Sequence, residues 1–286
     1  MKTCLLCGSS NLTPVVRVDQ WTVVECAACE LGMLSPWPDD AELARLYQES
    51  YFAEHGIGYA ESAEDRERGV RGQSGRAALV RSWVSGDKLL DMGSATGHFL
   101  AAARARGFDV EGVELSAWAA EQARSELGVP VTLGEISDLG ATPRFDVVTM
   151  WHSLEHTRDP LSVLRATHAL LRDGGTVVIE LPNYRSYDAK GYGTAWTGWD
   201  LPYHRWHFSP KSLRTLLTQT GFRVRTVQRT PSRYVAARMK RIPIVGWARK
   251  LIAAWYVGRD LRIVAIKEAG EGCGPSRPGL VDSIGD

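Results

Sequence analysis

The chain has 286 residues, of which 44% are hydrophobic and 23% are charged, a composition typical of a globular protein with one large domain and a small appendage. No apolar run reaches the roughly 18 residues that a membrane-spanning helix needs, and the first residues show no signal-peptide pattern, so we expect a cytoplasmic protein. The net charge is +1, but residues 201–259 hold 13 Lys and Arg and no Asp or Glu, which suggests an anionic substrate or surface, although a solvated basic face would explain it equally.

Four of the five cysteines lie near the N-terminus as two Cys-x2-Cys pairs, Cys4 with Cys7 and Cys26 with Cys29. The spacing between the pairs matches a four-thiolate zinc site, and with no water-binding ligand in view such a site is closed and structural. Two disulfides are the alternative, which a reducing cytosol disfavours. We therefore predict a zinc ribbon over residues 1–36, with hairpin strands at 15–18 and 21–24.

Residues 37–76 are predicted to form a helical linker or cap, with a helical pattern at 40–55 and a charge-rich part at 59–76. A helix at 77–84 then leads into alternating strands and helices. The strands are expected at 88–92, 109–113, 130–133, 145–150, 176–181, 222–227 and 261–266, and the helices at 99–106, 117–127, 160–171 and 210–220. This alternation predicts an α/β fold with a doubly wound sheet, whose ligand crevice lies at the carboxyl ends of the strands. Residues 269–286, rich in Gly, Pro and Ser, are predicted to be a disordered tail.

The loop after the first of these strands reads Asp-Met-Gly-Ser-Ala-Thr-Gly from Asp91 to Gly97, and its small residues allow a ligand to approach the backbone. Glu114 ends the next strand, where an acid that holds a ribose is expected. The third glycine of the dinucleotide fingerprint is missing, and Asp91 would repel a pyrophosphate. A ligand with a ribose and positive charge, such as S-adenosylmethionine, suits both acids better. An ordinary strand–turn–helix is the alternative.

A stretch of about 26 residues before Ser209 shows no clear element and carries many aromatic residues between three glycines. Because long loops inside a compact domain are usually functional, we predict that residues 184–208 form a lid over an organic substrate. Simple anchoring of a long loop by its aromatic side chains is the alternative. The aromatic residues are Tyr184, Tyr187, Tyr192, Trp196, Trp199, Tyr203, Trp206 and Phe208.

Four stretches within residues 77–268 together resemble class I S-adenosylmethionine-dependent methyltransferases: LDMGSATGHFL, VELS, LGEISDL, and FDVVTMWHSLEHTRDP through LLRDGGTVVIELPN. The resemblance implies a seven-stranded Rossmann-like methyltransferase sheet. It also implies that Glu114 binds the ribose hydroxyls, that Glu135 lies near the adenine amino group and that Ile136 contacts the ring. Ala95 stands where the family often has glycine. The implied cofactor site comprises Asp91, Gly93, Ala95, Gly97, Glu114, Leu115, Glu135, Ile136 and Trp151.

The zinc knuckles and the segment LPYHRWHFSPKSL narrow the resemblance to bacterial methyltransferases of nucleotide-linked deoxysugars, cell-envelope glycans and other specialised metabolites. The sugar C-methyltransferases of that group carry a further C-terminal domain that this sequence lacks, so we expect a hydroxyl acceptor. Such an acceptor needs a base. By resemblance His204 is the first candidate, with His207 and His152 as alternatives, and each of them could instead be a hydrogen-bonding anchor.

Residues 231–260 are interpreted as a basic amphipathic insertion. Through residues 233–259 it could contact an anionic membrane surface, cover the crevice and pair with a phosphate, or pack plainly against the core. The predicted function is methyl transfer to a hydroxyl of an anionic small molecule, in the cytoplasm or peripherally at the inner membrane surface. An RNA methyltransferase, a sugar C-methyltransferase and a non-catalytic ligand-binding protein are the alternatives.

Overall fold

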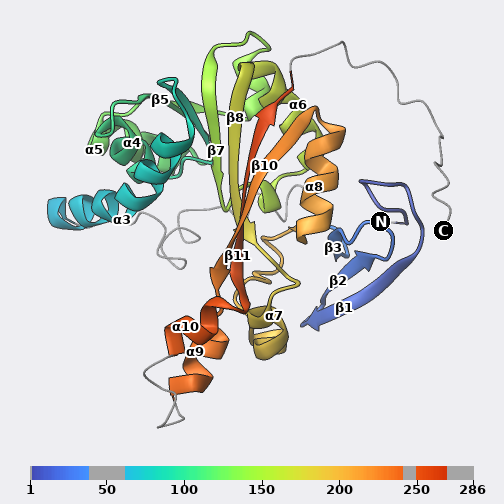
Figure 1. The fold of residues 1–286 in the computed structure, drawn as a ribbon. Coiled ribbons are helices and arrows are strands. Elements are labelled where there is room, and N and C mark those ends of the chain that lie inside the picture. The colour runs from blue at the N-terminus through green and yellow to red at the C-terminus, as the bar shows by residue number, and fades with distance from the viewer. Residues whose placement is uncertain (1, 39–61, 241–248, 269–286) are drawn as a thin grey trace, which may run out of the picture.

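A seven-stranded sheet forms the centre of the computed structural model, which describes residues 2–38, 62–240 and 249–268 (Figure 1). The strand order is β10-β11-β8-β7-β4-β5-β6. The strands β4 (Lys88–Met92), β5 (Asp109–Glu114), β6 (Val131–Leu133), β7 (Phe145–Trp151) and β8 (Leu171–Pro182) are parallel. β11 (Val257–Lys267) runs antiparallel to both β8 and β10 (Phe222–Pro231). The predicted seven-stranded, doubly wound α/β sheet is confirmed.

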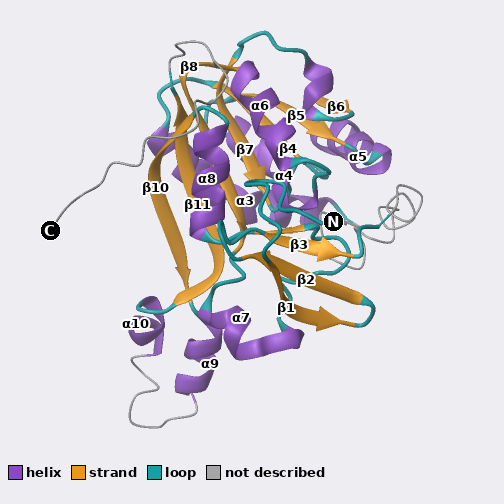
Figure 2. Cartoon of the chain, turned by 90° about the vertical axis from the view of Figure 1, so that its right-hand side faces the viewer, coloured by secondary structure: helices purple, strands orange, loops and turns teal. Residues whose placement is uncertain are grey.

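Helices cover both faces of this sheet (Figures 1 and 2). Neighbouring strand residues point to opposite faces, so Leu89 and Val147 belong to one apolar cluster and Leu90 and Val148 to the other. Burial on both faces explains why these strands read as continuous apolar runs. One cluster includes residues of α3 (Ala63–Trp83), α4 (His98–Arg104) and α5 (Ala117–Leu127), and the other includes residues of α6 (Pro160–Leu170) and α8 (Pro210–Gln219).

The helix ends follow the sequence signals. Ser116, Asp159 and Ser209 each accept a backbone N–H at the start of α5, α6 and α8, as their positions predict. Gly128 ends α5 in the left-handed conformation that glycine adopts most readily. These caps fix the loops that lead into and out of the carboxyl edge of the sheet.

A second, four-stranded sheet has the order β1-β2-β3-β9 and contains β1 (Leu12–Val18), β2 (Trp21–Cys26) and β3 (Gly32–Ser35) (Figure 2). Its fourth strand, β9 (Trp206–His207), comes much later in the sequence and pairs with β3. The Tyr184 hydroxyl also donates to Glu25 at 2.7 Å, and the Gln219 side chain donates to the backbone of Leu6 at 3.2 Å. The N-terminal unit is therefore docked on the central domain through strand pairing and side-chain contacts.

Three short helices lie at the carboxyl end of β8 (Figure 1). α7 (Tyr187–Tyr192) follows β8, while α9 (Arg233–Lys240) and α10 (Arg249–Ala254) lie between β10 and β11. Short 3-10 turns, η1 (Ile136–Leu139), η2 (Leu154–His156) and η3 (Gly193–Ala195), complete the loops. No helix among the described residues is long and apolar enough to cross a membrane.

The structure changes some of the predicted boundaries. The charge-rich part at 59–76 and the helix at 77–84 are largely one helix, α3, which begins after Ser62 and has too few apolar residues in its first half to be read by periodicity. The 26-residue stretch before Ser209 was wrongly expected to lack secondary structure, because α7 and β9 are too short to leave a pattern. The predicted helix at 40–55 and the tail at 269–286 lie outside the described residues.

Candidate active site

The loop between β4 and α4 is built around two glycines with positive φ, Gly93 at +70° and Gly97 at +80°. A Cβ atom on Gly93 would lie 2.6 Å from Cβ of Ser153, and one on Gly97 would lie 2.8 Å from a methyl group of Val129. Ala95 also has a positive φ of 46°, a conformation that costs a non-glycine residue energy. Close packing therefore holds this loop against the end of β7 and against the loop before β6.

Two carboxyl groups flank this loop. Asp91 is buried on β4 and accepts a hydrogen bond from Thr149 Oγ1 at 2.6 Å; burial raises the pKa of Asp91 to about 8. Glu114 ends β5 and accepts backbone N–H groups of Ala95 and Ser116, each at 2.9 Å. Burial raises the pKa of Glu114 as well. Two carboxyls that are poorly solvated in this way favour a ligand that carries positive charge or donates hydrogen bonds.

The remaining predicted cofactor residues lie at the ends of β5, β6 and β7. Ile136 in η1 is buried, Glu135 before it is exposed, and Leu115 after β5 is 68% exposed. Trp151 ends β7, and its ring lies 5.1 Å from that of Phe99. The structure thus brings the predicted residues to one edge of the sheet, the carboxyl edge of β4, β5, β6 and β7.

An arginine–glutamate network that the sequence analysis missed holds Trp151 from the other side. Glu180 on β8 is buried and accepts hydrogen bonds from Arg76 of α3 and from Arg262 of β11, whose Nε lies 2.7 Å away. The Arg76 guanidinium also lies 4.8 Å from the centre of the Trp151 ring. Despite burial, these two guanidinium groups and His152 keep the pKa of Glu180 well below its usual range.

His152 follows Trp151 and has a positive φ of 53°. Its Nδ1 lies 3.5 Å from Glu155 and its Nε2 lies 3.6 Å from Glu180. Burial opposes protonation of the ring, but the two carboxylates outweigh it and raise the pKa of His152 to about 9. Its side chain is 28% exposed, whereas that of His204 is 6% exposed. Of these two predicted histidines, His152 is the accessible one.

His204 approaches the same oxygen atom of Glu155 as His152 does. Its Nε2 lies 3.9 Å from Glu155 Oε1 and 3.5 Å from Asp200 Oδ2, while its Nδ1 lies 3.0 Å from the carbonyl oxygen of Gly198. The His156 ring packs edge-on against the His204 ring at 4.6 Å. One ligand atom each from Glu155, His156 and His204 lie within 4.8 Å of one another.

His207, the third predicted histidine, lies on β9 against the N-terminal sheet. It is buried, its ring lies 5.4 Å from that of Trp199, and a Cβ atom on Gly32 would lie 2.8 Å from its own Cβ. Burial together with the charge of His204 lowers the pKa of His207 to about 3. Its ring lies 6.3 Å from that of His204, so the structure separates it from the pair that faces Glu155.

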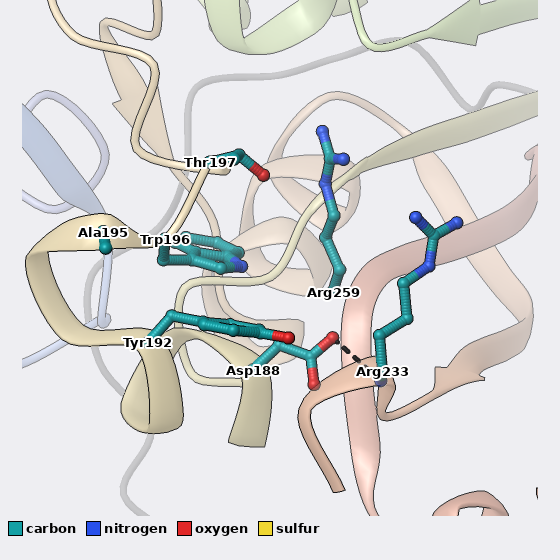
Figure 3. Close-up of a pocket in the computed structure, with 7 residues that line it drawn as sticks. All are labelled: Asp188, Tyr192, Ala195, Trp196, Thr197, Arg233 and Arg259. Carbon is teal, nitrogen blue, oxygen red and sulfur yellow. Dashed lines mark hydrogen bonds between the residues drawn. The ribbon is translucent and has the colours of Figure 1, made fainter. Parts of the chain in front are cut away.

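A cavity of about 220 Å³ opens where α7, α9 and β11 meet beyond the end of β8 (Figure 3). Arg233 and Arg259 extend into it side by side, and Thr197 turns its hydroxyl toward Arg259. Asp188, at its base, accepts hydrogen bonds from the start of α9, including the backbone N–H groups of Arg233 at 3.2 Å and Tyr234 at 3.0 Å. The cavity is lined by Asp188, Tyr192, Ala195, Trp196, Thr197, Arg233 and Arg259.

Two polar atoms at this cavity have no hydrogen-bond partner in the part of the chain that the structure describes. They are Nε1 of Trp196, whose side chain is buried, and Nε of Arg259, which lies 3.5 Å from Asp260 Oδ1. Asp260 is near enough to His152 that its charge contributes to the raised pKa of His152. The backbone N–H of Asn183, directly after β8, donates to the carbonyl oxygen of Arg259 at 2.8 Å, so the arginine pocket, as we call this cavity, lies at the carboxyl end of β8, the strand beside β7. Arg233 and Arg259 were in the predicted basic insertion, but sequence alone did not place them in one cavity.

The aromatic segment 184–208 is fixed to the body at several points. Tyr203 and Ala95 both pack against Ala119, so the segment reaches the loop after β4. Tyr187 and Tyr192 keep 47% and 43% of their surface exposed. The side chains buried in the interior are Tyr184, Trp196, Trp199, Trp206 and Phe208.

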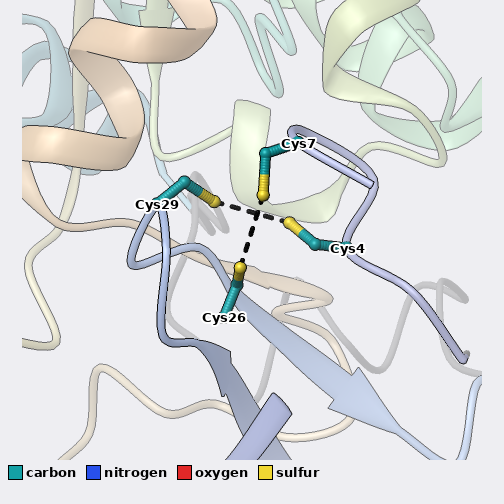
Figure 4. A group of neighbouring side chains, drawn as sticks. All are labelled: Cys4, Cys7, Cys26 and Cys29. Carbon is teal, nitrogen blue, oxygen red and sulfur yellow. Dashed lines mark hydrogen bonds between the residues drawn. The ribbon is translucent and has the colours of Figure 1, made fainter. Parts of the chain in front are cut away.

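The four N-terminal cysteines point their sulfur atoms toward a common centre (Figure 4). The Sγ atoms of Cys4 and Cys29 lie 3.4 Å apart, as do those of Cys7 and Cys26, and all four lie within 4.8 Å of one another. None of the four forms a disulfide. Four thiolates about 2.3 Å from one tetrahedral ion lie roughly 3.8 Å apart, so the arrangement fits a zinc ion.

The C-terminal part of the basic insertion, just before β11, carries exposed apolar side chains. Trp255, after α10, is 89% exposed and Leu251 is 69% exposed. Residues 241–248, between α9 and α10, lie outside the described part of the chain.

Comparison with known proteins places the chain in a family. Residues 60–227, more than half of the chain, match a family described as "Methyltransferase domain". A curated relative from Pseudomonas aeruginosa, named ubiquinone biosynthesis O-methyltransferase, is 36% identical over 110 residues, which are 36% of this chain and 47% of the relative. The chain thus matches about half the length of such relatives.

Solved structures show the same fold. An S-adenosylmethionine-dependent methyltransferase from Archaeoglobus fulgidus has a TM-score of 0.57 at 18% identity and covers 77% of this chain and 100% of its own. The 1,6-didemethyltoxoflavin N1-methyltransferase of Burkholderia thailandensis, solved with its substrate and S-adenosylhomocysteine, has a TM-score of 0.52 at 20% identity and covers 89% of this chain and 99% of its own. The family match shows that the chain belongs to the methyltransferase-domain family, and the shared sheet shows that it has the fold of class I S-adenosylmethionine-dependent methyltransferases.

Proposed function

We propose that this enzyme transfers the methyl group of S-adenosylmethionine to a hydroxyl oxygen of an anionic small molecule. The observation that carries the acceptor class is the arginine pocket, which lies at the carboxyl end of β8, at the same edge of the sheet as the loop after β4. The Pseudomonas aeruginosa relative is named an O-methyltransferase, which supports oxygen as the methylated atom. Nucleotide-linked sugars, envelope glycans and other phosphorylated or carboxylated metabolites are acceptors of this kind.

On the donor side, the roles follow from charge and burial. Asp91 is the carboxyl expected to bind the ammonium group of the donor, and Glu114 the one expected to bind the ribose hydroxyls. Gly93, Ala95 and Gly97 let the ligand lie close to the backbone. Ile136, Glu135, Leu115 and Trp151 then surround the adenine and the reacting end.

In the reaction itself, the acceptor oxygen attacks the methyl carbon and the carbon–sulfur bond breaks. S-adenosylhomocysteine leaves, and the hydroxyl proton passes to the solvent or to a base. Because this is an in-line displacement, the enzyme acts mainly by holding the two reactants in position. His152 is the histidine that we propose contacts the acceptor, because it follows β7 directly and its side chain is partly exposed.

We propose that the arginine pocket holds the negative group of the acceptor. Two guanidinium groups and the indole N–H of Trp196 are donors that match a phosphate or carboxylate. The exposed surfaces of Tyr187 and Tyr192, together with Tyr203 near the donor loop, supply the apolar wall of the proposed lid. We further propose that the four cysteines hold a structural zinc ion that keeps β3 paired with β9.

The acceptor class is tested with matched pairs of hydroxyl compounds, one member with a phosphate or carboxylate and the other with its neutral ester. Methyl-transfer kinetics should show a lower KM for the charged member. Substitution of Arg259→Gln should raise that KM about 10- to 100-fold, since hydrogen bonds to charged groups contribute about 1.5–3 kcal/mol. It should leave the KM for S-adenosylmethionine unchanged.

The control is Arg225→Gln, because Arg225 is an exposed arginine on β10 that donates only to the backbone of Trp83 at 3.3 Å. Equal KM values for the charged and neutral members would overturn the anionic acceptor. Methylation of carbon, or of RNA in place of the small molecules, would overturn the hydroxyl acceptor and favour one of the alternatives.

A further inference from the structure

We propose that Glu155, His156 and His204 bind a divalent first-row transition metal ion beside the donor site. This inference deepens the proposed function by assigning a metal to the acceptor site. Its test counts metal ions, so it does not depend on finding the acceptor.

The carboxylate of Glu155 is the reason to look for a cation. Its side chain is 1% exposed, and neither of its oxygen atoms has a hydrogen-bond partner among the residues that the structure describes. A buried carboxylate without such a partner is costly, and such groups in proteins are paired or coordinate metals. Nδ1 of His152 forms an ion pair with Oε1 of Glu155 at 3.5 Å, a distance beyond a good hydrogen bond.

His204 has the form that a metal ligand needs. Its Nδ1 faces the carbonyl oxygen of Gly198 at 3.0 Å, and a carbonyl only accepts, so the ring proton is on Nδ1. The lone pair is then on Nε2, the atom that faces Glu155. Histidine ligands in proteins commonly donate their other N–H to a carbonyl in this way.

The distances suit one shared ion. Ligand atoms each about 2.1 Å from an ion lie at most about 4.2 Å apart. Nε2 of His204 is 3.9 Å from Oε1 of Glu155, inside this limit. All three ligand atoms lie within 4.8 Å of one another, so a shift of at most about 0.6 Å brings each pair within the limit. Asp200 Oδ2, 3.5 Å from Nε2 of His204, is placed as a further ligand or as a hydrogen-bond acceptor for bound water.

Two elements bring the cluster to the donor loop. Glu155 and His156 belong to η2, directly after β7, and Ser153 before them packs against Gly93 of the loop. His204 is held by the β9 segment, where the backbone N–H of Arg205 donates to the carbonyl oxygen of Glu155 at 3.0 Å. An ion here could bind the acceptor hydroxyl and lower its pKa, which would make the oxygen a better nucleophile.

The donor set selects the kind of metal. Two imidazoles with one carboxylate favour zinc, manganese, iron or cobalt over magnesium and calcium, which prefer oxygen ligands. The cysteine cluster, with four sulfurs, would hold zinc but is a poor site for manganese. The two sites can therefore be distinguished in one protein.

The test uses the full chain. Reloaded with zinc and dialysed, the wild-type protein should retain about two equivalents of zinc per chain, against about one for Glu155→Gln and for His204→Gln. His168→Gln is the matched control, because His168 lies on α6 against Phe222 and belongs to neither cluster. It should retain about two equivalents. Circular dichroism and S-adenosylmethionine binding confirm that each variant is folded.

A second measurement needs no variant. Electron paramagnetic resonance of Mn²⁺ titrated into wild-type protein whose cysteine site is filled with zinc should show about one bound equivalent. Binding of no Mn²⁺ by the wild type, or full retention of the second metal ion in folded Glu155→Gln, would overturn the metal site. If the second ion binds but no acceptor is methylated, the metal site stands and the proposed acceptor class falls.

Discussion

Asp91 and Asp146 lie on neighbouring strands, and their pKa values are shifted in opposite directions. Asp91 is buried with one side-chain hydrogen bond, from Thr149, and burial raises its pKa to about 8. Asp146 is buried only in part, and it accepts the backbone N–H groups of Asp87 and Lys88 at 3.0 Å and 2.9 Å and a bond from Arg172 at 2.7 Å. These bonds outweigh its desolvation and lower its pKa. We therefore propose that Asp91 binds a ligand, whereas Asp146 stabilises the fold.

The Asp91→Asn variant should be more stable than the wild type without ligand, yet bind S-adenosylmethionine about 10- to 100-fold more weakly. The folded pKa of Asp91, about 8, lies above the unfolded value of about 3.9, so its contribution to stability is complete below pH 4 and is lost as the pH rises toward 8. Each pKa unit corresponds to about 1.4 kcal/mol. Thermal unfolding at pH 8 should therefore occur several degrees higher in Asp91→Asn, with the difference disappearing near pH 4.

The Asp146→Asn substitution should have the opposite effect on thermal stability. Because the pKa of Asp146 is lowered, its stabilising contribution is present at neutral pH and is lost as the pH falls through the folded pKa. This variant should unfold at a lower temperature at neutral pH and should bind S-adenosylmethionine normally. A drop in the melting temperature of Asp91→Asn at pH 8, with donor binding intact, would contradict the role given to Asp91.

At the scale of elements, β9 links the cysteine cluster to the active site. β3 directly follows the second cysteine pair and pairs with β9, whose residue His207 lies opposite Gly32. His204 lies three residues before His207, and Leu34 also donates its backbone N–H to the carbonyl oxygen of Arg205 at 3.0 Å. The N-terminal unit therefore helps to set the position of the segment that holds His204.

Loss of the cysteine site should impair acceptor turnover more than donor binding. In Cys7→Ser, hydrogen exchange of the backbone at 204–208 should become faster, and turnover should fall by up to about 100-fold, the loss expected for a misplacement of about 1 Å. Binding of S-adenosylmethionine should change little, because the donor acids lie on β4 and β5. Unchanged exchange at 204–208 in a variant that has lost its zinc would contradict this link.

The elements that the sequence predicted are those with strong local signals. The strands from β4 to β8 and the helices between them carry apolar runs, caps and glycine stops, and the loop from Asp91 to Gly97 followed from its small residues. β9 has two residues and exists because β3, far away in sequence, pairs with it. Periodicity within one segment cannot reveal such a strand.

The candidate site could also be predicted only where its residues follow strands with strong local signals. Asp91 and Glu114 lie at the ends of predicted strands, so their proximity followed from the order of the sheet. The contact between Glu155 and His204 depends on the path of residues 183–208, and the network of Arg76, Glu180 and Arg262 joins three separate elements. Residue types alone carried no sign of these partners.

For the whole molecule, we propose that different parts of the fold bind the two substrates. The loops after β4, β5 and β6 form the donor side, while η2, the 184–208 segment and the start of β11 form the acceptor side. The arginine pocket lies at the outer end of that acceptor side, next to the basic insertion. This division explains the uneven charge of the chain, since the acidic part meets a cationic donor and the basic part meets an anionic acceptor.

The most direct test of this division follows a labelled methyl group. The enzyme is incubated with S-adenosylmethionine carrying a deuterated methyl group, together with a small-molecule extract and, separately, with RNA, and the products are identified by mass spectrometry. We predict label on an oxygen atom of anionic small molecules, lost in Asp91→Ala and reduced in Arg259→Gln. Label found in RNA, on carbon, or only on uncharged small molecules would contradict the account.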